Sequence, residues 1–153
     1  MNYLELSRNF SVLTRRFQAI IAAACEKMEL SYSEYVIIMK LYSEEGKSQD
    51  DLASILLVDK AVVTRTVSLL EKKGWVRREK DRRDKRINHL YLTDFARERQ
   101  SYLTAINEQW TALLAQKIKE NEREILTKSL KIAADQSLKI NARNFVEKLK
   151  YEN

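Results

Sequence analysis

The side chains in this sequence that are best suited to chemistry are lysines and arginines gathered in one short segment. Residues 72–86 read KKGWVRREKDRRDKR and hold nine basic and three acidic residues. The 153-residue chain has 28 basic and 22 acidic residues, so its whole net charge of +6 lies in these fifteen positions. Such a cluster binds phosphate oxygens, and arginine also pairs with the edges of bases. We therefore expect a nucleic-acid contact here, with a merely solvated surface run as the alternative.

The other residue types that could do chemistry are too few for a reaction centre. Cys25 and His89 are the only cysteine and histidine, and they cannot build a tetrahedral zinc site within one chain. No nucleophile stands beside a base, and no titrating groups are paired. We predict no enzymatic activity, no metal and no cofactor. No apolar stretch reaches the roughly 18 residues that span a bilayer, and no signal peptide is visible, so we expect a soluble, cytoplasmic protein.

The elements that position the basic segment must be mostly helical. Gly46 and Gly74 are the only glycines, and there is no proline. Sandwiches, barrels and phosphate-binding loops depend on these two residue types at their turns. A chain of this length forms one ordinary domain with its own core.

Two helices are predicted in the first third of the chain. Apolar residues recur every three or four positions between residues 6 and 28, which predicts a long amphipathic first helix. Ser31 and Glu34 have the spacing of a capping box and begin a second helix, which Gly46 can end.

A pair of shorter helices follows. Ser48 with Asp51 repeats the start signal for a third helix through residue 56. Asp59 can cap a fourth helix that runs to residue 73 and ends at Gly74. The tight connection between them is typical of a helix-turn-helix.

The basic segment itself is predicted to form a hairpin. Alternating apolar and polar residues at 75–79 and 87–92 indicate two strands joined by a charged loop. Two long helices then follow over 94–118 and 121–149, each approaching 40 Å at about 1.5 Å per residue. Their apolar faces exceed what the short central elements can cover, which indicates a homodimer; a helical bundle closed within one chain is the alternative.

Together these elements describe a winged helix-turn-helix, a mainly α fold with a small β-hairpin wing, flanked by long dimerisation helices. A helix that reads bases in the major groove needs a small, polar outer face. The fourth helix provides this face, and its candidate major-groove residues are Lys60, Ala61, Val62, Thr64, Arg65 and Ser68. The arginine-rich loop can follow the backbone or enter a minor groove.

Residues 30–96 resemble the MarR family of bacterial transcriptional regulators. The similarity rests on LSYSEYVIIMKL, on DLASILLVDKAVVTRTVSLLEKKGWVRR, on DKR at 84–86 and on LYLT at 90–93. Ala96 departs from the family, which usually has glycine after LT. The resemblance implies a homodimeric regulator on a pseudo-palindromic, double-stranded DNA operator. We expect a DNA-binding domain at 31–93 between dimerisation helices at 1–30 and 94–153, all in one structural unit.

The resemblance also implies roles for the basic residues of the hairpin. Arg86 would enter the minor groove with Asp84 as its orienting partner, although Asp84 can equally be a turn residue. Arg83 and Lys85 would accompany them in the wing. The residues assigned to phosphate contacts, which position without specifying sequence, are Arg77, Arg78 and Arg82.

Control by a small molecule is implied by the same resemblance. Family members commonly respond to phenolic or lipophilic ligands bound between the dimerisation and DNA-binding regions. The aromatic residues on the helices that would meet there are Phe17, Tyr35, Tyr42 and Trp110, although aromatic residues at helical spacing are more often core.

Cys25 offers a second mode of control, because some members of the family sense peroxides through one cysteine. Here it lies late in the first helix, in AAACEKMEL, where a small buried hydrophobe is the alternative. Our main hypothesis is a repressor released by a ligand. The alternatives are a redox-sensing repressor that uses Cys25 and a non-regulatory, architectural DNA-binding dimer. His89 is interpreted as an ordinary strand residue.

Overall fold

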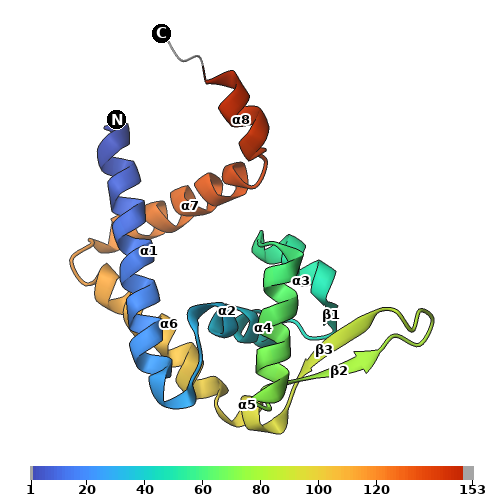
Figure 1. The fold of residues 1–153 in the computed structure, drawn as a ribbon. Helices are drawn as coiled ribbons and strands as arrows, with labels where there is room; N and C mark the ends of the chain where they lie inside the picture. Colours follow the sequence, from blue (N-terminus) through green and yellow to red (C-terminus); the bar gives the residue numbers. More distant parts are fainter. Residues whose placement is uncertain (1, 150–153) are drawn as a thin grey trace. The chain divides into compact units, whose positions relative to one another are not determined.

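The computed structural model describes residues 2–149 and divides into two compact units, Met1–Trp110 and Thr111–Asn153. The first unit contains helices, a small sheet and the basic hairpin (Figure 1). Its elements are α1 (Tyr3–Cys25), the 3-10 turn η1 (Glu26–Met28), α2 (Tyr32–Ser43), β1 (Lys47–Ser48), α3 (Gln49–Leu56), α4 (Lys60–Lys72), β2 (Val76–Lys80), β3 (Asn88–Leu92), α5 (Asp94–Glu98) and most of α6 (Gln100–Ala115). The second unit holds the end of α6, then α7 (Glu120–Ser137) and α8 (Ala142–Lys148).

The helices of the helix-turn-helix begin where the capping patterns predict. Ser31 and Glu34 form a reciprocal capping box at the start of α2, and Ser48 with Asp51 does the same for α3. Each box satisfies two backbone donors that a helix N-terminus otherwise leaves free. Asp59 caps α4, because its Oδ1 accepts a hydrogen bond from the backbone N–H of Ala61 at 2.6 Å.

The end of α4 confirms the predicted role of Gly74, which has φ +76°. The N–H of Gly74 donates to the carbonyl of Glu71, and the N–H of Trp75 donates to that of Leu70 at 2.9 Å. This is the Schellman arrangement, which requires a left-handed residue after the helix. Trp75 and Leu70 are both buried, so the turn leads the chain from α4 directly into β2.

Gly46 has a different role from the one predicted. Helix α2 ends at Ser43, three residues earlier, and Gly46 has φ +75° in the turn that leads into β1. Its N–H donates to the carbonyl of Leu90 at 2.9 Å. Strand β1, which the sequence pattern did not predict, adds two residues to the hairpin.

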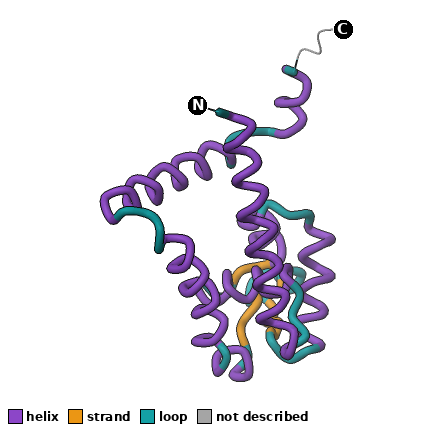
Figure 2. The backbone as a smooth tube through the Cα atoms, turned by 90° about the vertical axis from the view of Figure 1, so that its left-hand side faces the viewer, coloured by secondary structure: helices purple, strands orange, loops and turns teal. Residues whose placement is uncertain are grey.

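The hairpin is part of a three-stranded antiparallel sheet with the order β1-β3-β2. In β2, Val76 pairs with Leu92 and Lys80 pairs with Asn88 in β3. The strands, orange in Figure 2, make up a small part of a chain that is mainly helical. The hairpin projects away from α2 and α4 and carries its loop outward (Figure 1).

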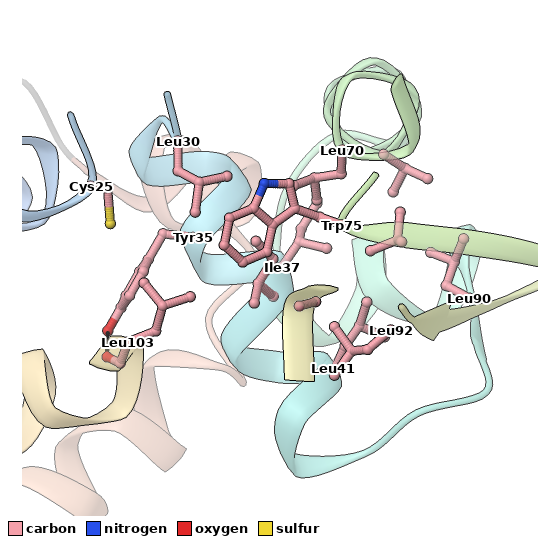
Figure 3. Packing of buried hydrophobic residues seen from close by; sticks show 14 of the residues in the cluster. Cys25, Leu30, Tyr35, Ile37, Leu41, Leu70, Trp75, Leu90, Leu92 and Leu103 are labelled. Carbon is pink, nitrogen blue, oxygen red and sulfur yellow. Dashed lines mark hydrogen bonds between the residues drawn. The ribbon is translucent and has the colours of Figure 1, made fainter. Parts of the chain in front are cut away.

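The core of the first unit joins the helices to this sheet (Figure 3). Trp75, Tyr35 and Leu90 are among its largest fully buried side chains. Figure 3 shows Trp75 between Leu30 and Ile37 on one side and the strand residues on the other. Burying each large apolar side chain contributes about 1.5–3 kcal/mol, so this core fixes both α4 and the base of the hairpin.

The C-terminal helices are shorter than the sequence pattern predicts. The predicted helix over 94–118 is broken at Arg99, whose guanidinium donates to the carbonyl of Phe95 while its N–H turns to that of Ala96. It also ends at Ala115, before Ile118. At about 1.5 Å per residue, α6 is about 24 Å long rather than 40 Å.

The predicted helix over 121–149 is likewise divided. It begins at Glu120 and ends at Ser137, and a separate helix starts at Ala142. The side chain of Asn141 caps α8 by accepting from the N–H of Asn144 at 3.1 Å, a start signal that the apolar periodicity concealed. None of the helices within residues 2–149 is long and apolar enough to cross a membrane.

Candidate nucleic-acid interface

Helix α4 presents one buried and one exposed face. Val63, Val67 and Leu70 are completely buried, and this spacing is that of a single helical stripe. On the other side Thr64 and Arg65 are exposed. The outer face at the N-terminal half of α4 is therefore small and polar around one arginine, as a helix needs to enter a major groove.

The first turn of α3 holds two of the predicted major-groove residues. The ammonium of Lys60 lies 2.7 Å from the carboxylate of Asp50. The hydroxyl of Thr64 donates to Oε1 of Gln49 at 3.3 Å. Both side chains are exposed, so these contacts orient them at the surface without removing them from it.

The turn between α3 and α4 contains a strained residue. Leu57 has φ +54°, a left-handed conformation that costs a residue with a side chain roughly 1–2 kcal/mol. The N–H of Val58 closes the turn by donating to the carbonyl of Ala53 at 3.1 Å. This tight turn sets the angle at which α4 leaves α3.

The remaining predicted residues of α4 differ in how far their side chains are exposed. Ala61 is exposed, but Val62 is half-buried and lines an apolar cavity against α2. Ser68 is also half-buried, and its hydroxyl accepts from the guanidinium of Arg78 at 3.0 Å. Val62 and Ser68 therefore contribute less surface to a DNA contact than the other four.

The loop of the hairpin has a defined structure built on Asp81. One carboxylate oxygen of Asp81 accepts from the backbone N–H groups of Arg83 and Asp84 at 2.7 and 2.8 Å. The N–H of Asp81 donates to the carbonyl of Ile87 at 2.9 Å and closes the loop. The hydrogen bonds that the carboxylate accepts lower the pKa of Asp81 to about 2; the bond from the N–H of Asp84 contributes most, followed by those from His89 and from the N–H of Arg83.

Asp84 does what a turn residue does. Its Oδ1 accepts from the backbone N–H of Arg86 at 2.9 Å, and no ion pair joins the two side chains in the described part of the chain. Apart from Asp84 and Ile87, the side chains that the loop exposes are basic, and residues 2–149 offer none of these basic side chains a salt bridge: Arg82, Arg83, Lys85 and Arg86. They are free to meet an anionic partner.

The two arginines predicted to contact phosphates have partners already. Arg77 pairs with Glu79 and lies over the ring of Tyr91, 5.1 Å from its centroid. Arg78 reaches from β2 to α4, where it meets Ser68 and lies 3.5 Å from Glu71. Arg77 remains exposed, whereas Arg78 is half-buried and braces the wing against α4.

One surface cavity brings the two predicted contact regions together. It has a volume of about 300 Å³, and Lys60 of α4 and Arg86 of the loop both line it. The rest of its polar wall is formed by Ser48, Gln49, Asn88 and Asp50, whose carboxylate is paired with Lys60. A backbone phosphate group that entered this space would meet basic side chains from the helix-turn-helix and from the hairpin at once.

The aromatic residues predicted as a ligand pocket have partners within the protein. The hydroxyl of Tyr35 donates to the carbonyl of Leu103, and that of Tyr42 donates to the carbonyl of Ala96 at 2.5 Å. Burial raises the pKa of each of these tyrosines to about 12. Phe17 stacks on Trp110 with ring centroids 6.4 Å apart. Tyr35 belongs to the buried core, and Phe17 and Tyr42 pack against it.

The surroundings of Cys25 do not favour a reactive thiol. The side chain is completely buried, and burial raises its pKa. Because the thiolate is the reactive form, this environment lowers reactivity. Nor does any group of His, Cys, Asp and Glu side chains within residues 2–149 form a candidate metal site.

Sequence reasoning missed three residues that shape the hairpin. Asp81 was counted only as part of a charged run, and His89 only as a strand residue. The side chain of Glu45 accepts from the N–H of Leu92 and pairs with Arg97 at 2.8 Å. Asp81 could have been found by its spacing, since an aspartate two and three residues before amide donors is a turn signal; the other two contacts are long-range.

Comparison with known proteins points to one family. Residues 30–87 match the sequence model of the MarR family. The chain is 39% identical over 69 residues to the HTH-type transcriptional regulator TtmR of Methylorubrum extorquens. That match covers 45% of this chain and 35% of TtmR, so it spans about a third of that relative's length.

Solved structures extend the similarity over most of the chain. A MarR transcriptional regulator from Methanosarcina mazei Go1 matches with a TM-score of 0.84 and 27% identity, over 89% of this chain and 98% of that one. A putative MarR family regulator from Listeria monocytogenes, complexed with 26mer DNA, matches with a TM-score of 0.82. Its 20% identity, over 95% and 96% of the two chains, shows the shared fold alone.

The helix-turn-helix of α3 and α4, followed by an arginine-bearing hairpin, defines a winged helix-turn-helix DNA-binding protein. Residues 30–87 match the MarR family, and the fold of the chain is similar to that of a solved MarR regulator over 89% of its length. The proteins that it is similar to are named as transcriptional regulators.

Proposed function

We propose that this protein is a homodimeric repressor that binds a pseudo-palindromic DNA operator and is released from it by a small apolar ligand. The observation that carries the proposal is the pairing of two basic surfaces: the outer face of α4 around Arg65, and the ordered loop with its unpaired arginines. Because the protein would bind DNA, we expect it in the cytoplasm.

The contacts divide by what each side chain can reach. Arg65 can form a bidentate pair with guanine, and Thr64 and Lys60 beside it can bond base edges. Arg86 and Arg83 of the loop suit a narrow minor groove, whose potential attracts arginine; Lys85 accompanies them. Arg82 and Arg77 suit phosphates, whereas the contacts of Arg78 with α4 favour a structural role.

Two apolar surfaces support a homodimer. On α1, Leu6, Phe10 and Leu13 follow one another at steps of four and three and are 38%, 42% and 41% exposed. On α7, Leu126 and Leu130 are each 42% exposed at a spacing of four. Contiguous apolar faces are rarely left open to water, and a second copy of the chain covers them with the same residues.

An apolar cavity supports control by a ligand. It has a volume of about 200 Å³ and lies between α2 and the start of α4. Tyr32 and Val36 line it from α2, and Val62 and Thr66 line it from α4. A small phenolic or lipophilic molecule there would bury its apolar surface and shift α4 relative to α2. The distance between the two recognition helices of the dimer would then no longer match the half-site spacing of about 34–36 Å.

Fluorescence anisotropy on labelled duplexes tests the DNA contacts. We expect the duplex from upstream of the protein's own gene to bind at least about 10³-fold more tightly than a shuffled duplex. Arg65→Ala should relax the preference at one base position by about 1–3 kcal/mol, whereas Arg82→Ala should weaken both duplexes equally and reduce the salt slope by about one. Equal affinities of the unaltered protein for both duplexes would refute specific binding.

Sedimentation equilibrium tests the dimer. Leu13→Glu places a charge on the apolar face of α1 and should shift the protein to monomers. Leu4→Glu is the matched control, since Leu4 is 86% exposed and lies off that face, and it should remain a dimer. Monomers in the unaltered protein at micromolar concentration would contradict the proposal.

Thermal unfolding with a panel of substituted phenols tests the effector cavity, because a ligand that binds the folded state raises Tm. The same phenols should release the DNA duplex. Val36→Phe fills the cavity and should abolish both effects, while Val12→Phe, exposed on α1, should keep them. Equal responses of the two variants would place the ligand elsewhere.

A further inference from the structure

The single histidine of the chain lies at the base of the hairpin loop and bridges two segments. His89 is on β3, and its Nδ1 is 2.8 Å from the carbonyl oxygen of Gly46, in the turn before β1. Its Nε2 is 2.9 Å from Oδ2 of Asp81, the residue that organises the loop. One imidazole ring therefore joins the helix-turn-helix side of the sheet to the wing.

Both partners of this ring are hydrogen-bond acceptors. A backbone carbonyl has no proton to give, and the pKa of Asp81 of about 2 leaves its carboxylate without one near neutral pH. A neutral imidazole carries one N–H and can donate to only one of them. The two short distances are satisfied together only by the doubly protonated imidazolium, which donates from both nitrogens.

The charges around His89 favour this form. The carboxylates on the elements packed around it include Asp81 of the loop, Asp51 of α3 and Glu79, which is opposite His89 in β2. The cations on the paired strands are Lys47 of β1, whose ammonium is paired with Glu44 at 2.6 Å, and Arg77, Arg78 and Lys80 of β2. The pKa of His89 is raised above its ordinary 6.5, mainly by the hydrogen bond with Asp81 and, despite partial burial, further by that with Gly46.

Asp81 connects the ring to the arginines. While Oδ2 meets His89, Oδ1 accepts the backbone N–H groups of Arg83 and Asp84. Asp84 in turn accepts that of Arg86. Three successive hydrogen bonds therefore connect the ring of His89 to the backbone of Arg86, whose side chain is assigned to DNA.

We propose that His89 is the positioning residue of the wing: as an imidazolium it fixes the arginine loop against the helix-turn-helix, and its deprotonation loosens the loop and weakens DNA binding. The inference rests on the proposed DNA contacts of the loop. Since the raised pKa keeps the ring charged at lower pH, both bonds are present below that pKa and one is lost as the pH rises through it.

Nuclear magnetic resonance tests the ring without DNA, because the protein has one histidine and its imidazole signal needs no assignment. We expect both ring nitrogens protonated at about pH 6 and a midpoint above the ordinary value of about 6.5. Asp81→Asn keeps an oxygen for the loop amides but removes the carboxylate, so it should lower the midpoint. A midpoint at or below the ordinary value in the unaltered protein overturns the inference and leaves the proposed function standing.

DNA affinity as a function of pH tests the consequence. Between about pH 6 and pH 8.5 we expect the affinity of the unaltered protein to fall about fivefold per chain, the worth of one hydrogen bond. His89→Arg donates to both acceptors at every pH and should bind tightly with little pH dependence. His89→Gln should bind weakly and also without pH dependence.

Lys80→Gln is the control for charge, since Lys80 is exposed on the neighbouring strand. Lys80→Gln should weaken DNA binding by the same factor at every pH, so the pH dependence of the affinity should persist. Equal pH profiles for the unaltered protein and His89→Arg would overturn the inference. No binding by any variant at any pH would instead refute the DNA-binding function itself.

Discussion

Replacing Lys73 by methionine should expose how firmly the end of α4 is anchored. Lys73 is the last residue before Gly74, and its ammonium lies 2.7 Å from the carboxylate of Glu34 on α2. It also donates to the carbonyl of Glu29, in the turn before α2. Glu34 is only 2% exposed and accepts in addition from the N–H of Ser31 at 2.8 Å. Methionine keeps the length of the side chain but leaves a buried carboxylate without its cation.

The magnitude follows from burial. Breaking a buried ion pair costs about 3–5 kcal/mol. Lys73 is 28% exposed, so water reaches the vacated site and we expect a smaller cost, about 2–3 kcal/mol. Lys72→Met is the matched control, because Lys72 is exposed in the same helical turn. It should cost less than about 0.5 kcal/mol.

The effect must also depend on pH. Burial raises the pKa of Glu34, but hydrogen bonds from Lys73 and Ser31 outweigh it, and the net shift is downward. In the native protein this stabilisation is present above the ordinary pKa of a glutamate and is lost as the pH falls through the lowered one. Without Lys73, burial dominates and raises the pKa, so the cost of the substitution grows as the pH rises from about 4 to 7.

Urea denaturation at these two pH values measures the free energy of unfolding. Adding Glu34→Gln to Lys73→Met removes the unpaired charge and should restore part of the loss at pH 7, as a double-mutant cycle. The reasoning is refuted if Lys73→Met is no more destabilising than Lys72→Met, or if its cost is the same at both pH values.

Three further results are expected. Leu57→Gly should raise the free energy of unfolding by about 0.5–1 kcal/mol, because glycine accepts the φ of +54° and the leucine side chain is 67% exposed; urea denaturation would detect a loss instead. Gly74→Ala should cost about 1 kcal/mol by the same assay, since a Cβ there meets nothing within 4 Å and only φ +76° opposes it. Cys25 should react with a disulfide reagent only after unfolding, as its burial requires, and rapid native labelling would reopen redox sensing.

Local signals in the sequence carried the helix-turn-helix well. Ser31, Ser48 and Asp59 each predicted a helix start that the structure contains. Each signal acts within three residues, so it survives any tertiary arrangement. The role of Gly74 was equally predictable, because few residues other than glycine adopt the left-handed conformation that follows a helix.

The sequence-based predictions were wrong where a tertiary or competing contact determines the end of a helix. Gly46 does not end α2, because its N–H is taken by Leu90 across the sheet, which no local pattern encodes. Ile118 lies beyond α6 although it continues the apolar period. Periodicity marks which residues share a face but not where the hydrogen-bond ladder stops.

The site was predicted as a set of residue types more than as a geometry. The sequence located the basic segment and the outer face of α4, but not which arginines are free. Arg78 and Arg82 look alike in the sequence; in the structure Arg78 braces β2 against α4 while Arg82 is exposed. The bridge through His89 joins residues 43 positions apart, so only the folded chain could show it.

Chemical protection of DNA tests the central claim most directly, because dimethyl sulfate marks guanine N7 in the major groove and adenine N3 in the minor groove. On an operator from upstream of the gene we predict two clusters of protected guanines about 10 base pairs apart, one for each α4, with protected adenines beside them where the wings lie. Arg86→Ala should lose the adenine protection and keep the guanine protection. Uniform protection without clusters, or guanine protection lost together with adenine protection in Arg86→Ala, would contradict the account.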